Sequence, residues 1–133
     1  MNQTKSILLV DDDQTTILLT QLFLESMSLK NVHASSNGQE AIDFIHENCQ
    51  GQDQSNCPDL VLLDLKLPDI NGLDVLQKIR SSDINTNVPV IAQTAYAMSG
   101  DAKKSINAGC DDYISKPIDI EELQEKIKKL ISA

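Results

Sequence analysis

Polar side chains that could do chemistry stand directly after short apolar runs in this 133-residue sequence. Asp11, Asp12 and Asp13 follow the run I-L-L-V at 7–10. Asp64 ends a second run, D-L-V-L-L-D. Carboxylates this close repel one another, and burying them is costly unless an opposite charge compensates. The pattern therefore predicts a bound cation beside the aspartates.

The chemistry that suits these residues is phosphoryl transfer onto a carboxylate. Mg²⁺ prefers a few hard protein oxygens together with water and phosphate, so Asp11 and Asp12 are predicted to be the metal pair. Asp64 stands alone at the end of its run and is the predicted acceptor that forms an aspartyl phosphate. Thr94 ends the run V-P-V-I-A-Q-T and Lys116 follows Y-I-S. Both are predicted to bind the transferred phosphoryl oxygens.

A nucleotide is not expected to be the direct phosphoryl donor. The chain has only five glycines, and none of them forms a G-x-x-x-x-G-K or G-x-G-x-x-G loop. The phosphoryl group should therefore arrive already activated, on another protein or on a small acyl phosphate.

Short apolar runs alternate with amphipathic segments along the chain, and this alternation predicts strands followed by helices. The expected strands cover 7–10, 31–35, 60–63, 88–92 and 113–115. The expected helices cover about 15–27, 37–48, 72–82 and 99–108, and a fifth begins at Asp119. Asn37 and Glu40 are spaced like a capping box, Ser99 is a candidate N-cap and Gly109 a C-terminal stop. The fifth helix should place its apolar residues on one stripe: Ile120, Leu123, Ile127, Leu130 and Ile131.

Five strand–helix units predict an α/β fold with a parallel sheet that helices cover on both faces. Ligands of such sheets bind outside the carboxyl ends of the strands, where the strand order reverses. If strands one, three, four and five are neighbours, the four polar strand ends converge on one small volume. This convergence is the main argument for a site.

Simpler interpretations exist for single members of this set. A helix cap accounts for Asp13, which directly precedes a helix, but not for Asp64, whose next helix begins only near Asn71. Thr94 has an alternative interpretation as a loop residue whose hydroxyl is simply hydrogen-bonded. Lys116 has an alternative interpretation as an ordinary surface lysine.

The composition excludes some function classes. Eleven Lys and Arg against twenty Asp and Glu give a net charge of −9, and no basic run is present. Nucleic acid is therefore not expected to bind this chain, because such binding begins with positive charge on phosphate. The apolar runs are too short to span a membrane, and the first residues do not have the layout of a signal peptide. A cytoplasmic protein is expected.

The three cysteines are expected to be reduced thiols. Their number is odd and no C-x-x-C spacing occurs, which argues against a zinc or disulfide framework. Cys49 and Cys57 flank the polar stretch Q-G-Q-D-Q-S-N and are able to pair across it, but reduced thiols are the preferred interpretation.

The sequence resembles a response-regulator receiver domain of two-component signalling. The resemblance covers essentially the whole chain and implies a single receiver domain over 1–133 with no output domain. It also implies the flavodoxin-like (βα)5 fold, a five-stranded parallel sheet of order 2-1-3-4-5. The matching pieces are V-D-D at 10–12, D-L-K-L-P-D-I-N-G at 64–72, T-A-Y-A-M at 94–98 and D-D-Y-I-S-K-P at 111–117.

The resemblance assigns roles by position. It implies that Asp64 is the phosphoacceptor and that Mg²⁺ binds to Asp11, Asp12, Asp64 and the backbone carbonyl of Lys66. Thr94 and Lys116 are implied to contact the phosphoryl group, with Thr94 and Tyr113 as switch residues. The peptide bond between Lys116 and Pro117 is implied to be cis, which is a minority state for X-Pro bonds.

The partners follow from the same resemblance. A histidine kinase or a histidine phosphotransfer protein is the implied donor. The downstream partner is unknown and is expected at the face formed by the fourth helix, fifth strand and fifth helix. The domain is expected to be a signalling phosphoacceptor that takes part in its own phosphorylation and dephosphorylation, and not an enzyme acting on other substrates. The sequence does not distinguish a separate regulator from a receiver of a hybrid sensor kinase.

Two positions near the site are expected to change how fast the phosphoryl group is lost. Many relatives have D-x-x-M-P where this chain has D-L-K-L-P, so Lys66 adds a cation beside the site. Tyr96, two residues after Thr94, is bulky and could restrict the attacking water.

Two other functions remain as alternatives. Asp11-Asp12-Asp13-Gln14-Thr15 fits the D-x-D-x-T motif of haloacid-dehalogenase-like phosphatases, with Asp11 as nucleophile and Asp13 as acid/base. That interpretation leaves Asp64 unexplained and puts the lysine after the final acidic pair instead of before it. The second alternative is a receiver-like domain that binds a partner and never takes phosphate.

Overall fold

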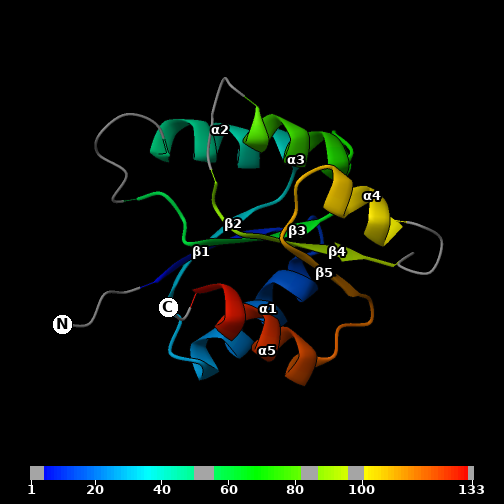
Figure 1. Cartoon of the computed structure of the whole chain (residues 1–133). Helices are drawn as coiled ribbons and strands as arrows, with labels where there is room; N and C mark the ends of the chain where they lie inside the picture. Colours follow the sequence, from blue (N-terminus) through cyan, green and yellow to red (C-terminus); the bar gives the residue numbers. More distant parts are fainter. Residues whose placement is uncertain (1–4, 50–55, 82–86, 96–100, 132–133) are drawn as a thin grey trace.

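The computed structural model describes residues 5–49, 56–81, 87–95 and 101–131, in which strands and helices alternate (Figure 1). The strands are β1 (Ser6–Val10), β2 (Asn31–Ser35), β3 (Leu60–Asp64), β4 (Val90–Thr94) and β5 (Asp112–Ser115). The helices are α1 (Gln14–Ser26), α2 (Gly38–Asn48), α3 (Gly72–Arg80), α4 (Asp101–Asn107) and α5 (Ile120–Ile131).

All five strands are parallel and lie in the order β2-β1-β3-β4-β5, as expected. Helices α1 and α5 cover one face of the sheet, and α2, α3 and α4 lie on the other side (Figure 1). The strand order reverses between β1 and β3, since β2 lies outside β1. The carboxyl ends of β1, β3 and β4 therefore meet at the centre of one sheet edge.

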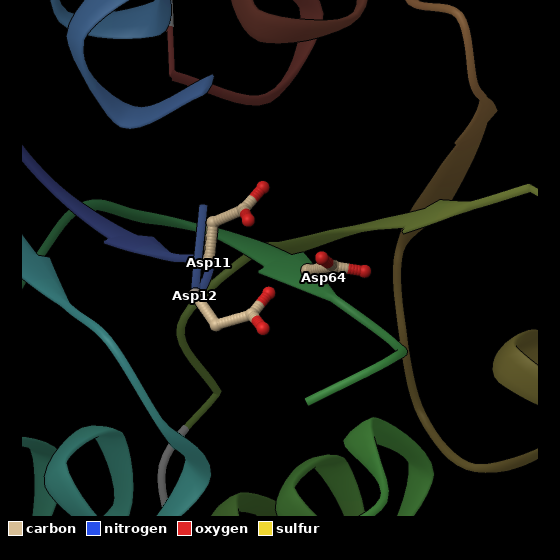
Figure 2. Close-up of side chains that lie close together, drawn as sticks. All are labelled: Asp11, Asp12 and Asp64. Atoms are coloured by element: carbon tan, nitrogen blue, oxygen red, sulfur yellow. The ribbon is translucent and has the colours of Figure 1, made fainter. Parts of the chain in front are cut away.

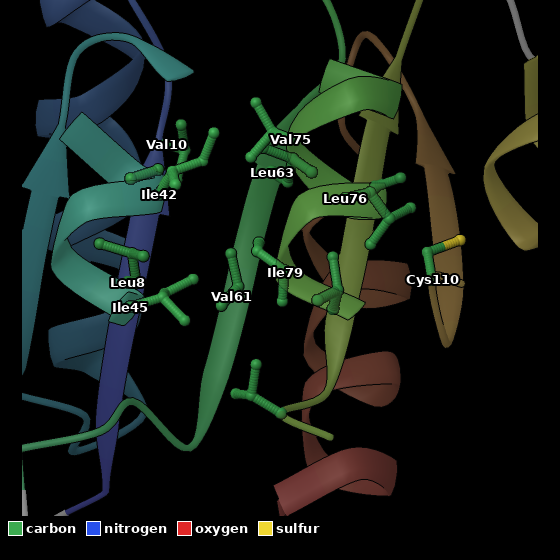
Figure 3. Packing of buried hydrophobic residues seen from close by; sticks show 14 of the residues in the cluster. Leu8, Val10, Ile42, Ile45, Val61, Leu63, Val75, Leu76, Ile79 and Cys110 are labelled. Atoms are coloured by element: carbon green, nitrogen blue, oxygen red, sulfur yellow. The ribbon is translucent and has the colours of Figure 1, made fainter. Parts of the chain in front are cut away.

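The core has two layers because the central strands are buried on both faces. Successive side chains of β1 alternate between the layers, with Leu8 and Val10 on one side and Ile7 and Leu9 on the other. Figure 3 shows the first layer, in which strand residues pack against Ile42 and Ile45 of α2 and Val75, Leu76 and Ile79 of α3. Burial on two faces explains why β1 and β3 read as continuous apolar runs.

The helix starts follow from local capping. Asp13 Oδ1 accepts a hydrogen bond from the Thr15 N–H, which confirms its predicted role as the cap of α1. Asn37 Oδ1 accepts from the Glu40 N–H, but the Glu40 carboxylate bonds the N–H of Ser36, one residue before the cap. The predicted cap at Ser99 lies outside the described residues.

Two expectations about apolar segments were wrong. The fourth strand begins at Val90 and not at Val88, because Pro89 has no N–H to donate, although its carbonyl still accepts from the Val61 N–H. Ile120 does not lie on the buried stripe of α5 and is 51% exposed. It is the first residue of the helix. Leu123 and Ile127 are buried in the core, and Leu130 and Ile131 are partly buried against it.

The expectation of reduced thiols was wrong for two of the three cysteines. Cys49 and Cys57 form a disulfide, with Cα atoms 4.7 Å apart, and Cys110 is buried and takes no part in a disulfide. Cys49 caps the C-terminus of α2 and Cys57 shortly precedes β3, so the packing of α2 on the sheet brings the two together. Composition and the expected compartment do not reveal this proximity.

No helix in the described ranges combines the length and the apolar character that crossing a membrane requires.

Candidate phosphoacceptor and metal site

The predicted site residues line one cavity of about 690 Å³ at the carboxyl edge of the sheet. It is formed by the ends of β1, β3, β4 and β5 and by the loop between β3 and α3. The predicted residues that line it are Asp11, Asp12, Asp64, Lys66, Thr94 and Lys116.

Three carboxylates gather at the ends of β1 and β3 (Figure 2). One oxygen from each of Asp11, Asp12 and Asp64 can be chosen so that all three lie within 4.8 Å of one another. Asp11 and Asp64 are buried, whereas Asp12 is exposed. Asp11 comes two residues after Leu9 and Asp64 two after Leu62, so both point to the face covered by α1 and α5.

This cluster fits a hard divalent cation. Asp11 Oδ2 is buried and has no hydrogen-bond partner among the described residues. Burial raises the pKa of the Asp11 carboxyl, while the hydrogen bond from the Asp13 N–H and the charge of Lys116 act in the opposite direction. A buried oxygen of this kind calls for a positive partner, and an all-oxygen donor set suits Mg²⁺.

The ammonium group of Lys116 is a positive charge that lies beside the acidic cluster. Its Nζ lies 3.0 Å from Asp64 Oδ2 and 3.7 Å from Asp11 Oδ2. Lys116 follows β5, so its side chain passes β4 to reach the end of β3. The peptide bond between Lys116 and Pro117 is cis, as the family resemblance implies.

The loop after β3 begins with a tight turn around the predicted acceptor. The Lys66 N–H donates to Asp64 Oδ1 (3.0 Å). An added Cβ at Gly72 would lie 2.4 Å from the Leu65 Cα, so only glycine allows α3 to start this close to the strand end. The backbone of Lys66 is thereby held beside Asp64.

The two predicted switch residues lie at different depths along the sheet. Thr94 is buried at the end of β4, and its carbonyl accepts from the Lys116 N–H (2.8 Å). Tyr113 pairs in register with Ala92 and is half-buried, with Lys126 Nζ 5.6 Å from its ring centroid. Tyr113 does not line the cavity, and Tyr96 lies outside the described residues.

Two polar residues near the site were not found from the sequence. Gln93 is paired in register with Asp64 and is buried, and its side-chain oxygen and nitrogen have no hydrogen-bond partner among the described residues. Asp69 lines the cavity and bonds the start of α2. No motif marks Gln93. Asp69 lies within D-L-K-L-P-D-I-N-G, but its bonding partners are about thirty residues away along the chain, so no local signal reveals its contact with α2.

Known proteins resemble the chain over nearly its whole length. A family model described as the response regulator receiver domain matches residues 7–128. The polar-differentiation response regulator DivK of Brucella anthropi is 35% identical over 127 residues, with 96% of each chain covered. These matches extend across all the elements that form the site.

Solved structures show the same architecture. The receiver domain of sensor histidine kinase PA1611 from Pseudomonas aeruginosa PAO1 superposes with a TM-score of 0.83 at 28% identity, covering 98% of this chain and 100% of that one. Its crystal structure has a magnesium ion coordinated in the active site cleft. A CheY-like receiver domain protein from Methanospirillum hungatei gives a TM-score of 0.79 at 32% identity, covering 98% and 95%.

Proposed function

The chain belongs to the family of response regulator receiver domains of two-component systems, and we propose that it accepts a phosphoryl group on Asp64 from a phosphohistidine donor in the presence of Mg²⁺. The observation that carries the proposal is the acidic cluster of Asp11, Asp12 and Asp64 with the Lys116 ammonium against Asp64. The family is a signalling family, so the phosphoryl group serves as a signal and not as an intermediate in turnover of another substrate.

Asp11, Asp12, Asp64 and the Lys66 carbonyl would hold the metal. A bound Mg²⁺ supplies positive charge to the phosphoryl oxygens and keeps the neighbouring carboxylates ionised. The magnesium ion in the cleft of the PA1611 receiver domain supports this choice of metal.

In the proposed reaction an oxygen of Asp64 attacks phosphorus, forming a P–O bond. The P–N bond to the donor histidine breaks, and its electron pair returns to the imidazole nitrogen. The Lys66 N–H holds the other oxygen of Asp64 and so orients the carboxylate for attack. The Lys116 ammonium moves from the carboxylate to the transferred phosphoryl oxygens, where the Thr94 hydroxyl also binds.

The phosphoryl donor would dock beside an apolar groove between α1 and α5. The groove shares Thr16 and Lys116 with the reaction cavity and is lined by Leu19, Phe23 and Ile120. Leu18, Leu19 and Leu22 of α1 are each more than half exposed, and Glu25 is the only charged residue of this helix. A histidine kinase or phosphotransfer protein with an apolar surface beside its phosphohistidine fits this groove.

Phosphorylation would shift the domain between two packings. The added charge draws Thr94 toward the phosphate, and Tyr113 turns inward into the space this frees. Helix α4 has little apolar anchorage, because Ile106, its one large apolar residue, is 51% exposed. The signalling face would therefore consist of α4, β5 and α5. A change in the amide exchange of α4 on adding beryllofluoride would support it, and unchanged exchange would contradict it.

One experiment tests the proposed function directly. The protein is incubated with Mg²⁺ and acetyl phosphate, and the modified residue is located by mass spectrometry. We expect a mass increase on Asp64 that is lost in Asp64→Asn and without Mg²⁺. Modification of Asp11 would instead support a phosphatase of haloacid-dehalogenase type, and no modification would support a domain that only binds a partner.

A cytoplasmic location is part of the same proposal. It rests on the expected kinase partner and not on the cysteines, since Cys49 and Cys57 are not reduced thiols.

A further inference from the structure

The loop between β3 and α3 is fixed at its base by backbone hydrogen bonds. The Leu65 N–H donates to the Gln93 carbonyl (3.0 Å), which ties the start of the loop to β4. The Gly72 N–H donates to the Leu65 carbonyl (2.9 Å), which closes the loop where α3 begins. Lys66, whose carbonyl is the proposed metal ligand, comes directly after this closed base.

The far part of the same loop is held by α2. Asp69 Oδ1 accepts from the Gly38 N–H (2.8 Å), and Asp69 Oδ2 accepts from the Gln39 N–H (3.0 Å). The N-cap of α2, Asn37, bonds the N–H of Glu40, so Asp69 serves the first two N–H groups of the helix. A carboxylate is favoured there by the partial positive charge of the helix N-terminus. We call these two bonds the Asp69 clasp.

Close packing accompanies the clasp. An added Cβ at Gly38 would lie 2.8 Å from Val75 Cγ2 of α3 and 3.1 Å from Ile70 Cβ of the loop, so a glycine lets α2 approach α3 and the loop this closely. Burial acts to raise the pKa of Asp69, but the hydrogen bonds from Gly38 and Gln39 lower it, and the net change is downward. The ionised carboxylate is therefore the form that holds the clasp.

We propose that the Asp69 clasp sets the position of the Lys66 carbonyl, which makes Asp69 a positioning residue for the Mg²⁺ site. The proposal rests on the function proposed above. Lys66 lies between the closed base at Leu65 and the clasp at Asp69, so fixing both ends restricts the direction of its carbonyl. Mg²⁺ tolerates little departure from octahedral geometry, so a small rotation of one ligand weakens binding.

The coupling also works in the reverse direction. If the clasp favours the metal, the metal must favour the clasp by the same free energy. Saturating Mg²⁺ should therefore slow the hydrogen exchange of the Gly38 and Gln39 amides. This effect would extend from the metal site to the N-terminus of α2, on the face of the sheet away from α1 and α5 (Figure 1).

The test is Mg²⁺ binding to the full chain by titration calorimetry, without a phosphoryl donor. Asp69→Ala should bind Mg²⁺ roughly 10-fold more weakly, the effect typical of losing a residue that orients a ligand. Asn37→Ala is the matched control, because it removes another cap of α2 and should lower stability while leaving Mg²⁺ affinity unchanged. Asp74→Asn removes an exposed charge from the first turn of α3 and controls for the loss of negative charge.

Gly38→Ala separates positioning from helix stability. Alanine favours a helix more than glycine and changes no charge, so a purely structural role of the clasp predicts unchanged Mg²⁺ affinity. The proposal predicts weaker binding, because the added methyl group pushes α2 away from Ile70 and Val75.

The outcomes separate the two proposals. Equal Mg²⁺ affinity of the wild type and Asp69→Ala would overturn the clasp and leave phosphorylation of Asp64 standing. A wild type that binds Mg²⁺ but takes no phosphoryl group on Asp64 would overturn the proposed function. The proposed role of the Asp69 clasp would then depend only on whether Asp69→Ala binds Mg²⁺ more weakly than the wild type. A wild type that does not bind Mg²⁺ would overturn both.

Discussion

The ammonium of Lys116 lies 3.0 Å from Asp64 Oδ2 and occupies the side of the carboxylate where a phosphoryl group would be added. This ion pair links the outermost strand, β5, to the central strand, β3. It also puts a fixed positive charge next to the oxygens that would bind Mg²⁺. In the proposed function Lys116 would therefore have two opposing effects, repelling the metal and attracting the phosphoryl group.

Lys116→Met should separate these effects. Phosphorylation by acetyl phosphate should fall by about 100-fold, because a donor to the phosphoryl oxygens is lost. Mg²⁺ affinity should rise in the same variant, because like charges repel. Calorimetry and the rate of mass increase measure the two quantities. Lys126→Met, which removes a lysine paired with Asp112, should change neither, and weaker Mg²⁺ binding in Lys116→Met would contradict the expectation.

Asp11→Asn should stabilise the metal-free protein at pH 7. The pKa of Asp11 is raised, chiefly by burial, and a carboxyl with a higher pKa in the folded state favours folding only while it is protonated. That contribution is full below the unfolded pKa and is lost as the pH rises through the folded pKa. Replacing the charge should raise Tm by roughly 2–5 °C, which corresponds to about 1 kcal/mol.

Calorimetry in EDTA and in Mg²⁺ checks this expectation. Mg²⁺ should raise the Tm of the wild type and have little effect on Asp11→Asn, and the difference between the two proteins in EDTA should shrink toward acid pH. Asp74→Asn, an exposed change on α3, should behave like the wild type. A lower Tm of Asp11→Asn in EDTA at pH 7 would show that the Asp11 carboxylate does not destabilise the metal-free protein.

Gln93→Leu should also raise stability. Both polar atoms of the Gln93 side chain are buried without a hydrogen-bond partner among the described residues, and such groups cost about 1–3 kcal/mol each. Leucine has a similar volume and would join Ile91 and Leu62 in the same layer. The midpoint of urea unfolding should increase at constant m-value. A decrease would mean that the amide has a partner in solution, such as a buried water.

Leu19→Glu should slow phosphoryl transfer from a protein donor only. Leu19 is 61% exposed and lines the groove beside Lys116, so a charge there would oppose docking of an apolar surface. Phosphorylation by acetyl phosphate should not change, because the small donor needs no docking. Ile106→Glu makes the same change on α4, away from the groove, and should leave transfer unaffected. Equal rates for Leu19→Glu and the wild type would place the donor elsewhere.

Lys66→Asn should shorten the lifetime of the aspartyl phosphate. The Lys66 side chain is exposed and lines the cavity, so its ammonium can hold phosphoryl oxygens and crowd the attacking water. The decay is followed by mass spectrometry after removal of acetyl phosphate. Lys78→Asn, on the exposed side of α3, is the control. Unchanged lifetimes in Lys66→Asn and in Tyr96→Ala would remove both residues as determinants of hydrolysis.

The sequence by itself determined the strand–helix alternation and the polar ends of β1, β3, β4 and β5. These follow from periodicity and from bonds between near neighbours, such as Asp13 with the Thr15 N–H, which do not depend on the rest of the fold. The order 2-1-3-4-5 came with the family resemblance, since the pattern of residues requires only a parallel sheet.

Only the tertiary structure decided which distant residues meet. The packing of the helices on the sheet decides three features: the Cys49–Cys57 disulfide, the hydrogen bonds of Asp69 to α2 and the exposure of Ile120. The packing of elements fixes such contacts, and the local sequence carries no signal for them. Tertiary packing also decides the short distance between Lys116 and Asp64, because the lysine side chain reaches from the end of β5 past β4 to the end of β3.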